Sequence, residues 1–155
     1  MRRTQEDQIR TLAGFGVRLA AFGGRRLQER LPELLESEER VLALACATRG
    51  GRWWQELRGV NTLIVVATDS RLLLAPWGVF TANSLLERSA QPPVESVPYT
   101  DVRSVEEHLG RLESKLTLTT ASGPVRLTSM RASWASAMAA VVREQLSSRS
   151  GSEVS

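Results

Sequence analysis

The sequence predicts a mainly β (α+β) fold, in which an antiparallel sheet of about seven strands bends into a sandwich or barrel and a C-terminal helix caps it. Two observations support this prediction. Short apolar segments with a period of two recur from Glu38 onward, and turn residues separate them. After residue 130 the period becomes helical, as expected for an amphipathic helix that covers the open end of a curled sheet. A further amphipathic helix is predicted ahead of the first strand.

Residues 4–31 are predicted to form that N-terminal helix. Pro32 would end it, because a proline disfavours the helical conformation of the residue before it. A break at Gly23 and Gly24 is the alternative, and it would give two shorter helices. Arginines lie opposite an apolar stripe whose members recur at spacings of three and four: Ile9, Leu12, Phe15, Leu19 and Phe22.

The apolar side of this helix needs a cover, because four glycines in the segment each cost about 1 kcal/mol relative to alanine. Gly16, Ala20 and Gly24 lie four residues apart and would let another backbone approach closely. The cover could be the chain's own domain, a second copy of the chain or a membrane surface, and these alternatives stay open. The predicted contact face comprises Leu12, Phe15, Gly16, Leu19, Ala20, Phe22 and Gly24.

The strands follow in order and are separated by turns. Segment 62–68 is apolar on both faces and rich in β-branched residues, which is typical of a well-covered strand. Asp69 and Ser70 predict a tight turn after it. Residues 76–93 form the longest irregular stretch, which is predicted to be a hairpin end and a mobile loop. The predicted strands are 41–48, 62–68, 71–75, 96–98, 102–107, 115–119 and 125–128.

The last structured element is predicted to be an amphipathic helix. Trp134, Met138, Val141 and Val142 line its apolar face, and the helix is predicted to fade near Leu146. The polar residues that follow predict a disordered tail. The sequence therefore divides into an N-terminal amphipathic helical segment at 1–36, a β domain at 37–147 and a disordered tail at 148–155.

The composition excludes several kinds of site. The 155 residues include one cysteine, Cys46, and one histidine, His108, so a disulfide framework and a structural zinc site are out of reach. A Ser-His-Asp triad would have to use His108, and nothing around that residue supports one. Cys46 shares a strand face with Leu42 and Leu44, which predicts an inert buried thiol.

Charge is unevenly distributed along the chain. Residues 1–31 hold seven arginines and three acidic residues, whereas the other 124 residues hold thirteen basic and fourteen acidic ones. The most apolar segment, 11–24, is shorter than the roughly 20 residues that span a bilayer, and no signal-peptide cleavage site follows it. The sequence therefore predicts a cytoplasmic protein, with a peripheral position at the inner face of the membrane as the alternative.

Three segments carry a resemblance to a known family. They are VVATDSRLLLAP at 65–76, SVPYTDVRSVEE at 96–107, and LTLTTASGPVRLTSM at 116–130 with the helix after it. In this order and spacing they resemble the bacterial pleckstrin-homology (PH) family, in particular its YokE-like branch, over about residues 38–146. The resemblance implies a seven-stranded bent sheet capped by a helix and no catalytic machinery. Among PH-like domains some bind lipid headgroups and many bind peptides or proteins.

The resemblance also indicates a candidate binding loop between the first two strands. Headgroup-binding members carry a basic cluster there, and the matching residues in this chain are Arg49, Arg52, Trp53, Trp54 and Arg58. The loop departs from the family pattern because it has no lysine and places two glycines between its first two arginines. The alternative is a solvated loop whose tryptophans pack back onto the protein. Outside this loop, Asp69 is expected to cap its own turn and Arg71 to cover the sheet edge.

Taken together, these observations predict a non-catalytic PH-like interaction module that binds a protein partner or a second copy of itself. The alternative is peripheral membrane association through the N-terminal helix and the loop at 49–54. No cofactor, metal ion or small-molecule substrate is predicted, because no convergent set of reactive residues is visible. Specific nucleic-acid binding is not predicted either, since the arginines are scattered and aromatic residues do not interleave with them.

Overall fold

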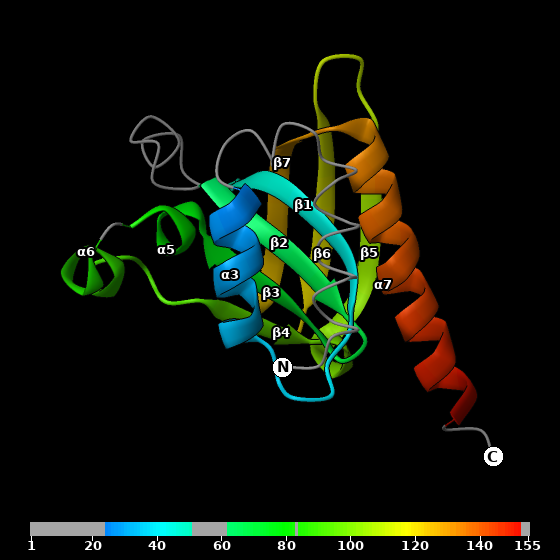
Figure 1. Ribbon diagram of the computed structural model, residues 1–155. Helices are drawn as coiled ribbons and strands as arrows, with labels where there is room; N and C mark the ends of the chain where they lie inside the picture. The colour runs from blue at the N-terminus through cyan, green and yellow to red at the C-terminus, as the bar shows by residue number, and fades with distance from the viewer. Residues whose placement is uncertain (1–23, 51–61, 83, 153–155) are drawn as a thin grey trace.

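The computed structural model describes residues 24–50, 62–82 and 84–152, and its strands lie where the alternating segments predict them (Figure 1). A seven-stranded antiparallel sheet and a long C-terminal helix confirm the mainly β class. The elements are α3 (Gly24–Leu34), β1 (Val41–Arg49), β2 (Thr62–Thr68), β3 (Arg71–Pro76), α5 (Trp77–Thr81), α6 (Leu85–Ser89), β4 (Glu95–Pro98), η1 (Tyr99–Asp101), β5 (Val102–His108), β6 (Ser114–Thr120), β7 (Gly123–Met130) and α7 (Ala132–Ser152).

The sheet has the strand order β4-β3-β2-β1-β7-β6-β5, so β1 joins its two halves. β1 pairs with β2 from Val41 to Thr48, but it pairs with β7 only at Thr48 and Arg49. The first part of β1 therefore has no strand on its β7 side, and α7 packs against it, against β5 and against β6 (Figure 1). The half-buried Trp134 of α7 packs against the apolar clusters of both sheet faces.

The alternation of β1 builds two apolar clusters on opposite faces of the sheet. Ala43, Ala45 and Ala47 belong to the larger cluster, which α7 covers with side chains that include Met138. The residues between these alanines face the other way, and Leu44 belongs to a second cluster that contains apolar residues of α3 and α5. Both faces of the first sheet half are thus covered, which explains why residues 63–67 of β2 and 72–76 of β3 are all apolar.

Helix α3 docks on its own domain. Leu31 is fully buried in the second cluster, and the Arg30 guanidinium donates hydrogen bonds to three backbone carbonyls at the end of α5. The prediction that the helix ends before Pro32 is wrong, because α3 continues to Leu34. These tertiary contacts outweigh the local preference of proline. Of the predicted contact face only Gly24 is described, and the other six residues lie outside the described ranges.

The stretch at 76–93 was predicted to be irregular, but it contains two short helices, α5 and α6. Val79 and Phe80 bury their side chains and hold α5 against the sheet. Gly78 permits close packing there, since a Cβ atom at this position would lie 2.0 Å from the Gln91 side chain. Sequence periodicity missed these helices because each has only five residues.

Helix α7 is longer than predicted and continues past Leu146 to Ser152. The prediction of a tail that is disordered from residue 148 is therefore wrong for the described part. Ser148 and Ser150 donate hydrogen bonds to carbonyls one turn earlier, and the Arg149 guanidinium lies 5.7 Å from the ring centre of Tyr99. This contact with Tyr99 supports the last turns of the helix. None of the described helices is long and apolar enough to cross a membrane.

Candidate binding site at the open end of the sheet

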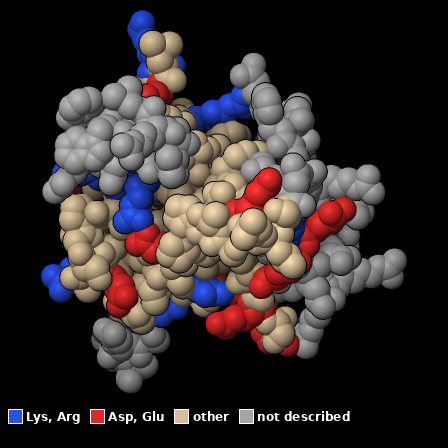
Figure 2. Space-filling view, turned by 90° about the vertical axis from the view of Figure 1, so that its left-hand side faces the viewer, with Lys and Arg blue, Asp and Glu red and all other residues tan. Residues whose placement is uncertain are grey.

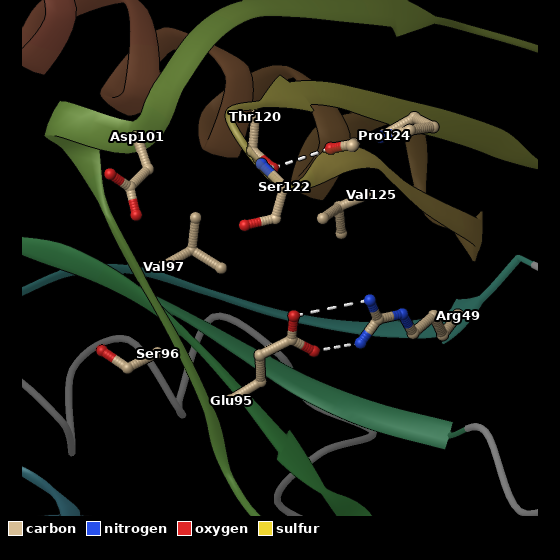
Figure 3. A pocket seen from close by; sticks show the side chains of 10 residues that line it. Arg49, Glu95, Ser96, Val97, Asp101, Thr120, Ser122, Pro124 and Val125 are labelled. Carbon is tan, nitrogen blue, oxygen red and sulfur yellow. Dashed lines mark hydrogen bonds and ion pairs between the residues drawn. The ribbon is translucent and has the colours of Figure 1, made fainter.

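Arg49, the predicted binding residue that the structure describes, forms an ion pair with Glu95 (Figure 3). We use the name open end for this end of the sheet, where β1 ends at Arg49 and β4 begins at Glu95. Arg49 is the last residue of β1, and Glu95 is the first residue of the edge strand β4. Both guanidinium nitrogens Nη1 and Nη2 donate to the carboxylate, the second over 3.4 Å. Each of the two side chains is 41% exposed, so the pair is accessible to solvent.

One side of this ion pair borders a polar cavity of about 220 Å³. The β6–β7 turn forms its wall: the Thr120 hydroxyl donates to the Gly123 carbonyl over 2.7 Å and accepts from the Ser122 amide. Gly123 has a φ of +121°, which only glycine adopts readily, so this tight turn depends on it. The lining residues are Arg49, Glu95, Ser96, Val97, Asp101, Thr120, Ser122, Gly123, Pro124 and Val125.

Two polar groups at this cavity have no partner within the described part of the chain: the Asp101 carboxylate and the Ser122 hydroxyl. The backbone of Asp101 is held in place, because its carbonyl accepts a hydrogen bond from the Ala121 amide over 2.9 Å. In Figure 3 both side chains lie across the cavity from the Arg49–Glu95 pair. They are therefore positioned acceptors that a ligand could use.

The other side of the ion pair borders an apolar cavity of about 200 Å³. Leu63 and Leu74 form its floor and belong to the larger apolar cluster. Three prolines complete the wall, and two of them precede β4. The lining residues are Arg49, Leu63, Leu74, Pro76, Pro92, Pro93 and Glu95. A polar and an apolar cavity thus share one wall, which is the Arg49–Glu95 pair.

The charges at this end of the sheet do not favour an anion. Among the described residues that line the two cavities, Arg49 is the one cation, and Glu95 and Asp101 are two carboxylates. Because the arginine already pairs with Glu95, the described residues of the site carry a net charge of −1. Figure 2 shows the side of the molecule on which α5 and α6 lie, where basic and acidic side chains are interspersed around an uncharged centre and form no basic patch among the described residues.

The remaining predicted residues of the binding loop, Arg52, Trp53, Trp54 and Arg58, lie outside the described ranges. Sequence reasoning missed Glu95 and Asp101, which face Arg49 across the open end. They are 46 and 52 residues from Arg49 along the chain, and nothing local in the sequence marks them. Their proximity depends on the bend that brings β4 and the β6–β7 turn together.

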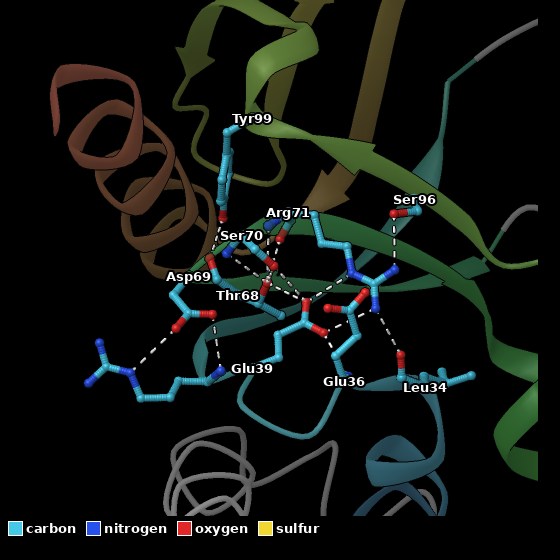
Figure 4. A network of polar contacts seen from close by, with 10 residues as sticks. Leu34, Glu36, Glu39, Thr68, Asp69, Ser70, Arg71, Ser96 and Tyr99 are labelled. Carbon is cyan, nitrogen blue, oxygen red and sulfur yellow. Dashed lines mark hydrogen bonds and ion pairs between the residues drawn. The ribbon is translucent and has the colours of Figure 1, made fainter. Parts of the chain in front are cut away.

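A second polar cluster joins the end of α3 to the β2–β3 turn (Figure 4). Glu39 is buried, with 4% of its surface exposed, and accepts hydrogen bonds from Arg71 at 2.9 and 3.0 Å. Burial raises the pKa of Glu39, but hydrogen bonds from Arg71, the Glu36 amide and Thr68 outweigh burial and lower the pKa to about 2. Arg71 also donates to the Leu34 carbonyl. This cluster stabilises the fold and reaches the lining of the polar cavity through Ser96, whose hydroxyl accepts from Arg71 over 3.2 Å.

The expected roles of Asp69 and Arg71 are therefore wrong. The Thr68 hydroxyl, not Asp69, caps the turn by accepting from the amides of Ser70 and Arg71. Asp69 instead accepts from the backbone amide of Arg40 and forms an ion pair with its guanidinium. Arg71 pairs with a buried carboxylate and does not simply cover the sheet edge. The sequence does not single out this pair, since Glu36, Glu38 and Glu39 all stand just before the first strand.

Outside the site, the cysteine, the histidine and a carboxylate are candidate reactive groups, and none of them is part of a catalytic arrangement among the described residues. Cys46 is half-buried, and burial raises the pKa of its thiol, which disfavours the nucleophilic thiolate. Glu107 accepts from Arg143 over 2.8 Å, and this hydrogen bond lowers the pKa of the carboxyl. His108 is exposed at the end of β5. In the described ranges no group of three or more His, Cys, Asp or Glu side chains is placed to hold a metal ion.

The fold and the site define a mainly β protein whose bent sheet has a two-part cavity at one end. No protein-family model matches the chain, and no curated protein is significantly similar to it in sequence. The resemblance of its three segments to the bacterial PH family therefore stays a prediction.

Proposed function

We propose that the chain is a non-catalytic, PH-like interaction module that binds a protein partner or a second copy of itself at the open end of its sheet. One observation carries this proposal: a polar and an apolar cavity lie on the two sides of the Arg49–Glu95 pair. Each cavity has about the size for a single side chain and is smaller than the roughly 300–1,000 Å³ typical of small-molecule sites. Neighbouring side chains of a polypeptide fit such a pair of cavities.

The antiparallel strand order and the covering helix α7 support the PH-like part of the proposal. The electrostatics of the site favour a protein ligand over an anionic lipid headgroup. A headgroup phosphate at Arg49 would have to displace Glu95 and would then face two carboxylates. The non-catalytic part is supported by the environments of Cys46 and Glu39, which are occupied in packing and ion pairing.

The test is a selection of random decapeptides on the full chain, followed by measurement of dissociation constants by fluorescence anisotropy. The variant Ser122→Trp fills the polar cavity from an exposed turn, and Ser104→Trp on exposed β5 is the matched control. We expect selected peptides to bind wild type and Ser104→Trp equally and Ser122→Trp at least tenfold more weakly. The proposal is wrong if no peptide is enriched or if Ser122→Trp binds as wild type does.

Vesicle flotation separates the proposal from the membrane alternative. We expect the full chain to show no more retention on anionic than on neutral phosphatidylcholine vesicles at 0.15 M salt. Retention on anionic vesicles that falls at high salt would support peripheral membrane association instead. The N-terminal residues and most of the loop that would carry such binding lie outside the described ranges, so this measurement tests them directly.

A further inference from the structure

We infer that the open end recognises an extended peptide in which a basic side chain enters the polar cavity and an apolar side chain two residues away enters the apolar cavity. This inference rests on the proposed function and names the chemistry of the partner. In an extended strand, side chains two residues apart lie on the same face and about 6.7 Å apart. The two cavities share Arg49 and Glu95 as a wall, so two such neighbouring side chains can reach both.

The basic side chain is indicated by the charge of the polar cavity. Within the described lining, Arg49 and Glu95 neutralise each other, which leaves the carboxylate of Asp101 as the uncompensated charge. A lysine or arginine of the partner would bring the net charge of the site to zero. A guanidinium could also donate to both Asp101 and the Ser122 hydroxyl, which have no partner within the described residues.

The apolar side chain is indicated by the floor and rim of the second cavity. Leu63 and Leu74 are 7% and 1% exposed, so the cavity opens directly onto the larger apolar cluster. Proline rings at Pro92 and Pro93 form the rim, and neither can donate a backbone hydrogen bond into the cavity. A buried polar group would therefore find few partners there, whereas an aliphatic side chain gains by leaving water.

The Arg49 and Glu95 side chains between the cavities can form hydrogen bonds with the backbone of the bound peptide. Both partners are 41% exposed, and an ion pair of this exposure contributes little to stability, so it can rearrange at little cost. The Glu95 carboxylate can accept from a peptide N–H, and the Arg49 guanidinium can donate to a peptide carbonyl. The backbone between the two anchoring side chains would then lie over the pair.

The probe is the peptide acetyl-Gly-Gly-Arg-Ala-Leu-Gly-Gly-amide, titrated into the isotope-labelled full chain and followed by amide chemical shifts. Two further peptides carry Glu in place of Arg, or Ser in place of Leu. We expect the Arg-Leu peptide to bind at least tenfold more tightly than either. Shifts should centre on the amides of the β6–β7 turn and the start of β4. Equal binding of the three peptides, or no binding up to millimolar concentration, would overturn the inference.

Substitutions of Asp101, the carboxylate expected to accept from the basic side chain, test the inference a second time through the affinity of the peptides. Asp101→Asn should weaken the Arg-Leu peptide about five- to tenfold, and Asp101→Arg should reverse the preference in favour of the Glu-Leu peptide. Glu106→Gln, an exposed carboxylate of β5, is the control with the same change in charge and should bind as wild type does. An unchanged affinity in Asp101→Asn would also overturn the inference. If an Asp101 variant does not fold, Ser122→Trp takes its place. The inference then requires that Ser122→Trp no longer binds the Arg-Leu peptide more tightly than the other two peptides.

Failure of this inference differs from failure of the proposed function. Decapeptides that bind the open end but carry acidic or uncharged residues in place of the basic one would overturn the inference and leave the proposed function standing. The absence of any peptide that is sensitive to Ser122→Trp would overturn both.

Discussion

Glu39 is a single residue that joins three parts of the chain. Its carboxylate binds Arg71 and Thr68 of the β2–β3 hairpin and the Glu36 amide after α3. Transfer of a charged carboxylate from water into the protein interior costs free energy. Here a bidentate ion pair with Arg71 and further hydrogen bonds compensate that cost. Removal of either partner would leave the other charge buried without compensation.

Glu39→Gln should lower the free energy of unfolding at pH 7 by about 3–5 kcal/mol, as expected when one partner of a buried ion pair is lost. The pKa of Glu39 falls from 4.5 to about 2 on folding, so its contribution is complete above the unfolded pKa and disappears as the pH falls through the folded one. Urea unfolding of wild type between pH 7 and pH 2 should therefore show a decline in stability below about pH 5 that is smaller in the variant. Equal pH profiles would contradict this assignment.

Tyr99 offers a second test at the scale of one residue. Its hydroxyl donates to the Thr68 carbonyl over 2.6 Å, and burial raises the pKa of the phenol above its usual value. Tyr99→Phe should cost about 1–2 kcal/mol in urea unfolding, because a buried carbonyl loses its donor. Tyr99 is the sole tyrosine, so absorbance at 295 nm reports its ionisation alone. Titration near the ordinary pKa of 10 in the native state would contradict the buried position.

Among the elements, α3 shows how a helix with poor intrinsic propensity is retained. It contains Pro32 and begins with a glycine, and both disfavour helix. The fully buried Leu31 and the hydrogen bonds of Arg30 attach it to the sheet and to α5. Those bonds also satisfy carbonyls that the end of a short helix leaves without internal donors.

Arg30→Met should lower the stability by about 2–3 kcal/mol, because charge-assisted hydrogen bonds to Val79, Phe80 and Ala82 are lost while the aliphatic stem is kept. Arg111→Met, at an exposed arginine in the β5–β6 loop, is the matched control and should change little. Urea unfolding measures both. A loss of less than about 0.5 kcal/mol in Arg30→Met would show that apolar packing alone holds α3.

The end of α7 gives the second test at this scale. The half-buried Arg149 lies over the ring of the buried Tyr99, and a cation–π contact in such a setting contributes about 0.5–2 kcal/mol. Arg149→Gln should reduce thermal stability by that amount and lower the helical circular dichroism signal slightly. An unchanged signal and stability would favour the disordered tail that the sequence predicts.

At the scale of the whole molecule, the sheet belongs to both apolar clusters at once. β1, β2 and β3 each contribute side chains to the cluster under α7 and to the cluster under α3. Because neighbouring residues of one strand point to opposite faces, neither cluster can separate without disrupting the other. The described part of the chain should therefore unfold as one unit.

This cooperativity predicts coincident urea transitions by tryptophan fluorescence and by far-ultraviolet circular dichroism. Trp77 on α5 packs against the cluster under α3, whereas Trp134 on α7 packs against both clusters. Trp77→Phe and Trp134→Phe change how strongly these positions contribute to the fluorescence, and in wild type and in each variant the fluorescence midpoint should agree with the circular dichroism midpoint. Two separated transitions would show that the faces unfold independently.

Much of the fold follows from the sequence, because period-two alternation and turn residues are local signals. All seven strands lie within two residues of their predicted bounds, since side chains on a strand must alternate between its faces. The sequence also predicts that the C-terminal helix covers the sheet, because apolar residues at helical spacing give that helix one apolar face. The resemblance to the PH family predicts Arg49 as a candidate binding residue, but no local pattern predicts its partner Glu95.

The remaining features depend on contacts between residues far apart in the chain, which no local pattern records. Glu95 meets Arg49 because the sheet bends, and α3 continues through Pro32 because Leu31 has an apolar cluster to enter. Arg71 turns towards Glu39 because burial of that carboxylate requires a cation. The conformational preferences of single residues amount to about one or two kcal/mol. Such contacts outweigh them, because burying a side chain or breaking a buried ion pair involves a larger free energy.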